Sequence, residues 1–384
     1  MSGVKSDGAQ DAPAEGPVWP LGLAWLSCAL SRDLQRASRV AGGPEALWGA
    51  TRPQMAAWLR ADADVLDRAL AARGTFRAAS VRASLAGRGI LHLPITANAY
   101  PTRLRRIFDP PFGLFGVGSV ATALSALEHS PAIAIVGSRR PSGAGRRLAA
   151  ALAADLASRG AVIVSGLARG IDAAAHEGAL EAGGVTIAVL GSAVDRIHPR
   201  RHVGLADRIQ VNGAVVSEYW PGTDPLPWRF PARNRIVAGL CDATVVVEAG
   251  ARSGALITAD FAMENGSTVL AVPGWPASSL STGCNALIRS GAAVCEAADD
   301  VVREVPNGAW AEARVAPSPT GTTALVLAIV TRGPAGADAI AAEAGITHAE
   351  VAVALAALEL DGLVAREPGG VFGAVGVRGR GAGA

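Results

Sequence analysis

The stretch AIAIVGSRRPSGAGRRLAAALAADLASRGAVIVSG, residues 132–166, decides the fold class of this chain. It begins and ends with short runs of Ala, Ile and Val, and an alanine-rich helical pattern lies between them. Both runs are continuously apolar rather than alternating, which is typical of strands in a parallel sheet covered on both faces. The order strand, helix, strand therefore predicts a βαβ unit with two parallel strands.

The same alternation continues after this unit. Further β-rich runs occur at 185–191, 214–218, 243–249 and 268–274, and helical patterns lie among them. Regular alternation of strands and helices predicts a doubly wound α/β domain, which we place at residues 94–306.

The segments on either side have a different pattern. In residues 21–93, apolar residues recur at three- and four-residue spacing, which predicts a helical domain. Residues 307–321 read as a linker, and three helical patterns followed by a hairpin predict a winged helix at 322–376. The polar ends, 1–20 and 377–384, are predicted to be disordered.

The composition describes a globular protein. Half of the 384 residues are hydrophobic, and no apolar run is long enough to span a bilayer without interruption. The N-terminus has no apolar signal-peptide core. The four cysteines are widely spaced, with no CxxC pair, so we expect reduced thiols, no zinc site, no membrane contact and a cytoplasmic location.

Positive charge is concentrated in the middle of the chain. The net charge of the whole chain is only +2, and Lys5 is its only lysine. A GC-rich genome also explains the excess of arginine, so the distribution of charge is more informative than the residue type. Residues 131–240 hold 13 arginines against 8 acidic residues, whereas 322–375 hold 2 against 6. A polyanion should prefer the middle, and the winged helix should contact protein or pack internally.

Gly, Ser and Arg recur just after the predicted strands, at the edge where open α/β sheets bind ligands. Glycine lets the backbone approach phosphate, serine donates hydrogen bonds, and helix N-termini add oriented N–H groups. The segment FPARNR, 230–235, adds two arginines where a helix is predicted to begin. Together these loops predict a site for an extended anionic ligand. Its predicted residues are Gly137, Ser138, Arg139, Arg140, Ser165, Gly166, Arg169, Gly170, Arg233, Asn234, Arg235, Ser253 and Gly254.

Three further residues are expected to support this site. Asp172 and His176 lie four residues apart on one helix face, so we expect Asp172 to cap the helix. A structural or ligand-positioning role for His176 is favoured over that of a general base. Glu248, at a strand end, is expected to form buried hydrogen bonds, with catalysis as the alternative. We therefore assign no catalytic residue.

Common cofactor motifs are missing from the sequence. The glycines after the first strand fall at 137, 143 and 145, so there is no GxGxxG, and the second strand ends in Ser165 rather than an acidic residue. A Walker A loop needs a lysine, and the only one is Lys5. We expect neither a cofactor nor a metal.

At these residues the sequence resembles the DprA/Smf family, the DNA-processing protein A of bacterial natural transformation. The resemblance rests on VGSRRPS (136–142), SGLARGIDAAAHEGAL (165–180), FPARNRIVAGL (230–240), VVVEAGARSGALITADFA (245–262), AVPGWP (271–276) and GCNALIRSGA (283–292).

The resemblance implies an extended Rossmann-like core that binds single-stranded DNA, forms a homodimer and helps load the RecA recombinase. The N-terminal helices would then be a SAM-like domain. This chain departs from the family pattern at His198, where a tyrosine is usual, at His202, where an asparagine is usual, and at Ser267, where a basic residue is common.

Two functional hypotheses remain open at this point. The first is a protein that holds single-stranded DNA without cleaving it. The second is a nucleotide-binding hydrolase of the lysine-decarboxylase-like phosphoribohydrolase type. That class uses a PGGxGT motif followed by a glutamate, whereas this chain has GARSGALIT at 250–258. Whether Phe230 and its neighbouring aromatic residues stack on bases or only pack is also open.

Overall fold

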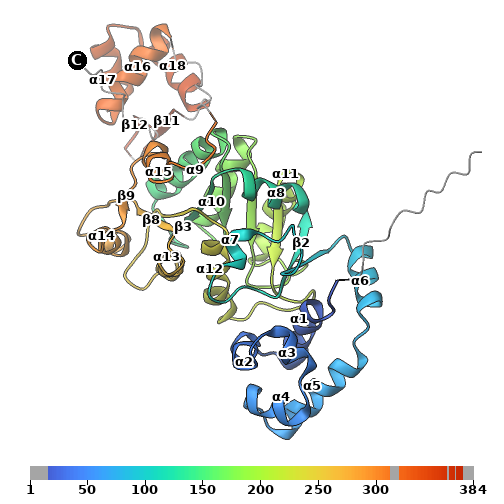
Figure 1. Ribbon diagram of the computed structural model, residues 1–384. Helices are drawn as coiled ribbons and strands as arrows, with labels where there is room; N and C mark the ends of the chain where they lie inside the picture. The colour runs from blue at the N-terminus through green and yellow to red at the C-terminus, as the bar shows by residue number, and fades with distance from the viewer. Residues whose placement is uncertain (1–15, 312–319, 361–362, 368, 375–384) are drawn as a thin grey trace, which may run out of the picture.

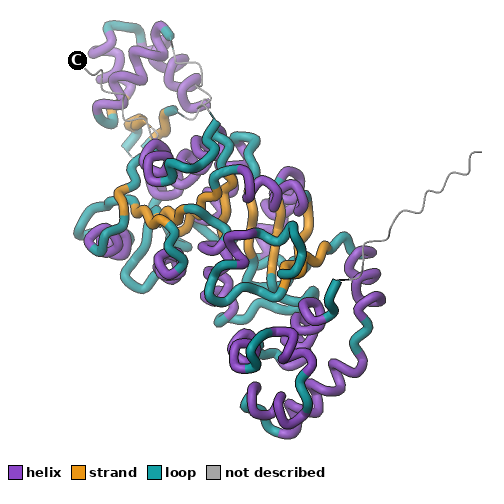
Figure 2. The backbone as a smooth tube through the Cα atoms, viewed as in Figure 1, coloured by secondary structure: helices purple, strands orange, loops and turns teal. Residues whose placement is uncertain are grey.

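A computed structural model describes residues 16–311, 320–360, 363–367 and 369–374 of the chain. Figure 1 shows a helical N-terminal part, a central sheet with helices around it, and a smaller C-terminal part beyond the sheet. In Figure 2 the strands run through the middle of the molecule, with helices on both sides of them.

The central sheet has nine strands in the order β1-β2-β6-β5-β4-β3-β7-β8-β9. Neighbouring strands from β6 to β9 in this order are parallel, which confirms the predicted doubly wound parallel sheet. At one edge the sheet is extended by β2 and β1, which pair in antiparallel fashion. The strands are β1 Leu91–Pro94, β2 Gly113–Gly118, β3 Ala132–Val136, β4 Val162–Ser165, β5 Thr186–Val189, β6 Ala214–Ser217, β7 Ala243–Val246, β8 Thr268–Ala271 and β9 Ala293–Val294.

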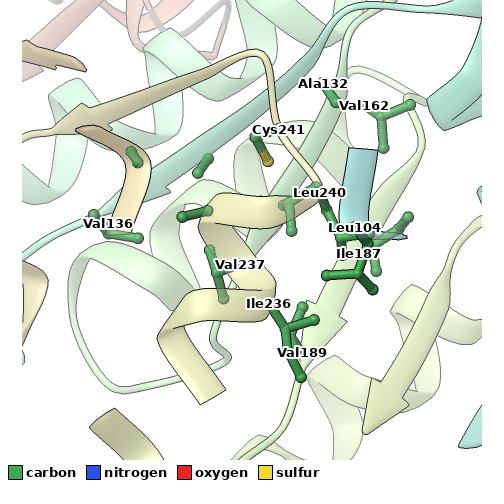
Figure 3. Packing of buried hydrophobic residues seen from close by; sticks show 14 of the residues in the cluster. Leu104, Ala132, Val136, Val162, Ile187, Val189, Ile236, Val237, Leu240 and Cys241 are labelled. Atoms are coloured by element: carbon green, nitrogen blue, oxygen red, sulfur yellow. The ribbon is translucent and has the colours of Figure 1, made fainter. Parts of the chain in front are cut away.

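Helices cover both faces of this sheet, because the side chains of each buried strand alternate between the two faces. One face packs on α9, α10 and α15, and the other on α8, α12, α13 and α14. Figure 3 shows Ile236 of α12 beside Val189 of β5. The helices are α7 Thr102–Arg105, α8 Val120–His129, α9 Gly143–Ser158, α10 Ile171–Glu181, α11 Val203–Asn212, α12 Arg229–Gly239, α13 Gly254–Glu264, α14 Thr282–Arg289 and α15 Ala298–Glu304, with a 3₁₀ turn, η1, at Arg200–His202.

The N-terminal part consists of six short helices; the first five share an apolar core, and the sixth packs through Leu85 in a separate cluster that includes Phe115 of β2. They are α1 Trp19–Leu30, α2 Gln35–Val40, α3 Pro44–Gly49, α4 Arg52–Leu59, α5 Ala63–Thr75 and α6 Ala78–Gly87. The first helix begins at Trp19, inside the stretch predicted to be disordered, because Trp19 and Pro20 are buried. Residues 1–15 lie outside the described residues. Strand β1 also falls mostly within the range assigned to the helical domain. The SAM-like assignment stays a prediction.

The C-terminal part is a winged helix, as predicted. Its elements are α16 Gly321–Arg332, β10 Ala335–Gly336, α17 Ala337–Ala344, α18 His348–Leu360, β11 Val364–Arg366 and β12 Val371–Ala374, and the strands form a sheet in the order β10-β12-β11. Most of the predicted linker, and the predicted disordered tail, lie outside the described residues. Trp310, at the start of that linker, donates from Nε1 to the Val305 carbonyl at 2.9 Å.

No single helix among the described residues is long and apolar enough to cross a membrane; α17 and most of α18 meet that test only as a pair, across a bend of 112°.

Candidate nucleic-acid interface

The candidate site lies where the order of strands reverses. From β3 the chain adds β4, β5 and β6 on one side, and then returns to place β7 on the other side of β3. In open α/β sheets, ligands bind outside the carboxyl ends of the strands at such a switch point. A groove of about 780 Å³ lies there, lined by the loops that follow β3, β4 and β7 and by α12.

Many of the predicted site residues meet in this groove. Those that line it are Gly137, Ser138, Arg139, Gly166, Asp172, Arg233, Asn234, Ser253 and Gly254. Arg140, Arg169 and Gly170 lie on the same loops but outside the lining, and both of these arginines are exposed. Ser165 is fully buried and donates from Oγ to the Ile135 carbonyl at 2.7 Å, so the structure does not bring it to the groove.

Glycines allow the loops to approach one another closely. A Cβ atom on Gly166 would lie 2.3 Å from Nη2 of Arg233. Gly170 has φ +82°, and a Cβ atom there would lie 2.3 Å from the Ser138 carbonyl oxygen. Because neither position has room for a side chain, the loops after β3 and β4 form one continuous rim.

Two exposed guanidinium groups line the groove. Arg139 places its Cζ atom 5.7 Å from the ring centre of Phe230, which also lines the groove. Arg252 lies in the loop after β7, and our sequence analysis did not include it among the site residues. Its position between two glycines, in GARSG, could have identified it as a site residue from the sequence. Both groups are placed to contact an anion in the groove.

Arg233 has a different role, because its side chain is buried. Only 4% of this residue is exposed, and Nη1 donates to the Gly166 carbonyl at 2.8 Å and to the Val189 carbonyl. Burial lowers the pKa of Arg233 to about 10, although the nearby charge of Asp172 acts in the opposite direction. Arg233 therefore ties the ends of β4 and β5 together at the wall of the groove.

Arg235 does not line the groove at all. Its Nη1 and Nη2 atoms each lie 2.6 Å from an oxygen of Glu218, and its Nε donates to the Asp109 carbonyl at 2.9 Å. All three nitrogens of its guanidinium group thus have partners within the protein. Arg235, which the sequence analysis placed among the ligand-binding residues, thus lies outside the groove and is engaged within the protein.

Asp172 orders the loop after β4. Its Oδ2 atom accepts hydrogen bonds from the backbone N–H groups of Gly166 at 3.1 Å and Ala168 at 3.3 Å. Burial raises the pKa of this carboxyl, while Arg233 and the two amide donors counteract the rise. The contacts reach back into the loop, so the expected helix cap is instead a loop contact.

His176 lies below the groove and does not line it. Its Nδ1 atom is 2.7 Å from the hydroxyl of Thr186, which donates its own proton to the Ile163 carbonyl at 2.8 Å. Nδ1 must therefore carry a proton and donate it. Burial lowers the pKa of His176 to about 3, so the ring is neutral at pH 7. These contacts give it a structural role.

Glu248 joins the two strands of the switch point. Its carboxylate accepts from the backbone N–H of Ser142 at 2.8 Å and from the Ser142 hydroxyl at 2.6 Å. Its carbonyl accepts from the backbone N–H of Ser138 at 2.6 Å. Glu248, at the end of β7, thereby fixes the loop that follows β3 and presents Arg139.

Within the described residues, no group of three or more His, Cys, Asp or Glu side chains is arranged to hold a metal ion. Ser267, one of the departures from the family pattern, directly precedes β8. It therefore lies at the amino edge of the sheet, away from the groove.

The fold and the groove define an α/β protein with a cationic site at the switch point of its sheet, followed by a winged helix. A model of the family DNA recombination-mediator protein A matches residues 92–306, and a model of the DprA winged helix domain matches residues 311–370. The chain belongs to this DprA/Smf family.

Curated relatives agree with this assignment. The chain is 45% identical over 210 residues to DNA processing protein DprA of Streptococcus pneumoniae, covering 55% of this chain and 72% of that protein. It is 40% identical over 288 residues to protein Smf of Escherichia coli, covering 72% and 76%. The family assignment does not favour the phosphoribohydrolase alternative.

Solved structures agree as well. DNA processing protein A from Streptococcus pneumoniae superposes with a TM-score of 0.62 at 35% identity, covering 74% of this chain and 96% of that one. The same protein from Helicobacter pylori was described for its unique single-stranded DNA binding mode. It superposes with a TM-score of 0.51 at 30% identity, covering 57% and 96%.

Proposed function

We propose that the groove at the switch point binds the backbone of single-stranded DNA and holds it without cleaving it. The observation that carries the proposal is the convergence of two exposed arginines, Arg139 and Arg252, with Ser138 and Ser253 on the carboxyl ends of β3 and β7. Guanidinium groups form charge-assisted hydrogen bonds with phosphate oxygens, and serine hydroxyls add neutral ones.

The support network favours holding over turnover. Asp172 and Glu248 accept hydrogen bonds from the loops that carry the arginines, and His176 is neutral and does not line the groove. Hydrogen-bond donors that are held rigidly in place are what a binding site for a polyanion requires. The Helicobacter pylori relative was described as a single-stranded DNA binder, which supports the same ligand class.

Binding of fluorescent oligonucleotides at several salt concentrations tests this proposal. We expect the full chain to bind single strands more tightly than duplexes of the same length. The logarithm of the binding constant should fall linearly with the logarithm of salt concentration, because each phosphate contact releases counterions. Equal affinity for duplexes, no binding at low salt, or shortening of the oligonucleotide would each contradict it.

We further propose that the protein acts as a homodimer and helps load the RecA recombinase on incoming DNA during natural transformation. This step rests on the resemblance to the family. Light scattering of the purified protein gives the oligomeric state. RecA filament formation on single strands already covered by a single-strand-binding protein gives the loading activity. A monomer would rule out the proposed homodimer. RecA assembly that is no faster with the protein would rule out the proposed loading activity.

A further inference from the structure

We propose that Trp275 forms a stacking platform for an unpaired base of the DNA strand held in the groove. This inference rests on the proposed function and adds to it the group that distinguishes single strands from duplexes. Guanidinium and hydroxyl groups bind phosphates, which both kinds of DNA carry, whereas only an unpaired base offers a free face to an aromatic ring. Trp275 lies in the loop after β8, and 75% of the residue is exposed.

The loop after β8 continues the wall of the groove. Strand β8 is the parallel neighbour of β7, so the two strands end at the carboxyl edge of the sheet about 4.8 Å apart. Leu280, in the same loop as Trp275, lines the groove together with Gly250 and Arg252 of the loop after β7. Phosphates follow one another about every 3.4 Å along the axis of a DNA strand. We therefore expect a phosphate bound at Arg252 to bring a neighbouring base to Trp275.

The backbone around Trp275 is held in place on both sides. The Asn285 side chain accepts from the Gly274 N–H at 3.1 Å and donates to the Gly274 carbonyl at 2.9 Å. Pro276 follows at the second position of a turn, which closes where the Ser278 N–H donates to the Trp275 carbonyl at 2.9 Å. A backbone that is already ordered loses little conformational freedom on binding, so more of the stacking energy contributes to affinity.

The Trp275 ring has no internal partner. Within the part of the chain that the structure describes, it contacts no other aromatic ring and no guanidinium group, and its N–H has no hydrogen-bond acceptor. The aromatic residue in the groove lining, Phe230, differs in this respect, because its ring already contacts Arg139 and His198. Trp275 is thus the aromatic side chain beside the groove whose ring is available to a base.

The test compares the full chain with Trp275→Ala on three ligands. They are a single strand of about 20 nucleotides, longer than one binding site, a duplex of that length, and an equally long abasic strand, which keeps the phosphates but has no bases. On the ordinary single strand we expect the variant to bind about 5- to 150-fold more weakly, the range that one base stack contributes. The slope of log affinity against log salt should not change, because no phosphate contact is lost. On the duplex and the abasic strand the variant should bind like the parent.

Two further variants serve as controls. Trp275→Phe should keep most of the affinity for the ordinary single strand, since phenylalanine also presents an aromatic face. Phe108→Ala removes another aromatic side chain, which is 82% exposed but lies outside the groove lining. It should bind all three ligands like the parent.

Three results would overturn the inference. Trp275→Ala binds the ordinary single strand as tightly as the parent does, or it loses as much affinity for the abasic strand as for the ordinary one. The third is a changed oligomeric state of Trp275→Ala in light scattering, because the tryptophan would then contact a second copy of the chain. In each case the parent still binds DNA, and the proposed function survives. If the parent binds no single strand, the proposed function itself fails.

Discussion

Arg235 and Glu218 form a two-pronged ion pair, in which both terminal nitrogens of the arginine lie 2.6 Å from a carboxylate oxygen. The side chains are only 9% and 15% exposed. Burial acts to lower the pKa of Arg235, but the charge and hydrogen bonds of Glu218 outweigh it, and the pKa rises above its ordinary value. An arginine of the FPARNR motif thus holds the fold together.

Removing this arginine should affect stability rather than DNA binding. Arg235→Ala leaves the charge of Glu218 buried without a partner, and breaking such a pair costs about 3–5 kcal/mol of unfolding free energy. Urea denaturation measures that loss. Arg140→Ala, at an exposed position, should stay within about 0.5 kcal/mol of the parent. If Arg235→Ala instead binds single strands more weakly and its stability is unchanged, Arg235 contacts the DNA and the interpretation is wrong.

Removing the arginines that line the groove should have the opposite effect. Arg139→Ala and Arg252→Ala take away exposed charges, so the unfolding free energy should barely change. Each should weaken single-strand binding and reduce the salt slope by about 0.7, since one phosphate contact is lost. Fluorescence anisotropy at several salt concentrations measures both quantities. Arg68→Ala, remote on α5, is the control. A weaker affinity with an unchanged slope would mean that the lost contact is not to phosphate.

The sequence predicted the parallel sheet because its strands are buried on both faces and therefore read as continuous apolar runs. It did not predict the antiparallel edge. Strand β2, Gly113–Gly118, contains glycines and lies beside Pro110 and Pro111, and β1 ends in Pro94. Such residues weaken a strand pattern, and only pairing with β6 shows that these segments are strands.

The sequence placed the candidate site at the carboxyl edge of the sheet, where the groove lies, but did not show which arginines face the groove. We expected a helix to begin at FPARNR, and α12 begins at Arg229; Arg233 and Arg235 lie in its second turn, on positions that are buried. The partner of Arg235 is Glu218, which is 17 residues earlier in the chain and follows β6. No local pattern connects the two residues, because the contact arises only when the strand and the helix pack together.

Gly166 should not tolerate a side chain. A Cβ atom there would lie 2.3–2.7 Å from the guanidinium atoms of Arg233, which is itself held by two backbone carbonyls. Gly166→Ala must therefore displace the buried arginine or the loop, and both stability and single-strand affinity should fall. Gly204→Ala is the control. Its Cβ atom meets nothing within 4 Å, and alanine is favoured over glycine in a helix by about 1 kcal/mol. Parent-like behaviour of Gly166→Ala would contradict the described packing.

The buried histidine below the groove should make stability depend on pH. The pKa of His176 falls from 6.5 to about 3 on folding, because burial disfavours the charged ring. Between these values the unfolded chain binds a proton that the folded protein does not, so stability is lost as the pH falls from 6.5 toward 3. This one group accounts for up to about 1.4 kcal/mol per pH unit in that window.

His176→Gln separates this contribution from those of other groups, such as His92, whose pKa burial likewise lowers to about 4. The variant loses the contact with Thr186 and should be less stable than the parent at pH 7. It has no ring to protonate, however, so the difference in unfolding free energy should shrink as the pH falls from 6.5 to 4. Urea denaturation across this range measures the difference, with His129→Gln, at an exposed position, as the control. A difference that stays constant with pH would show that His176 is not held neutral in the folded protein.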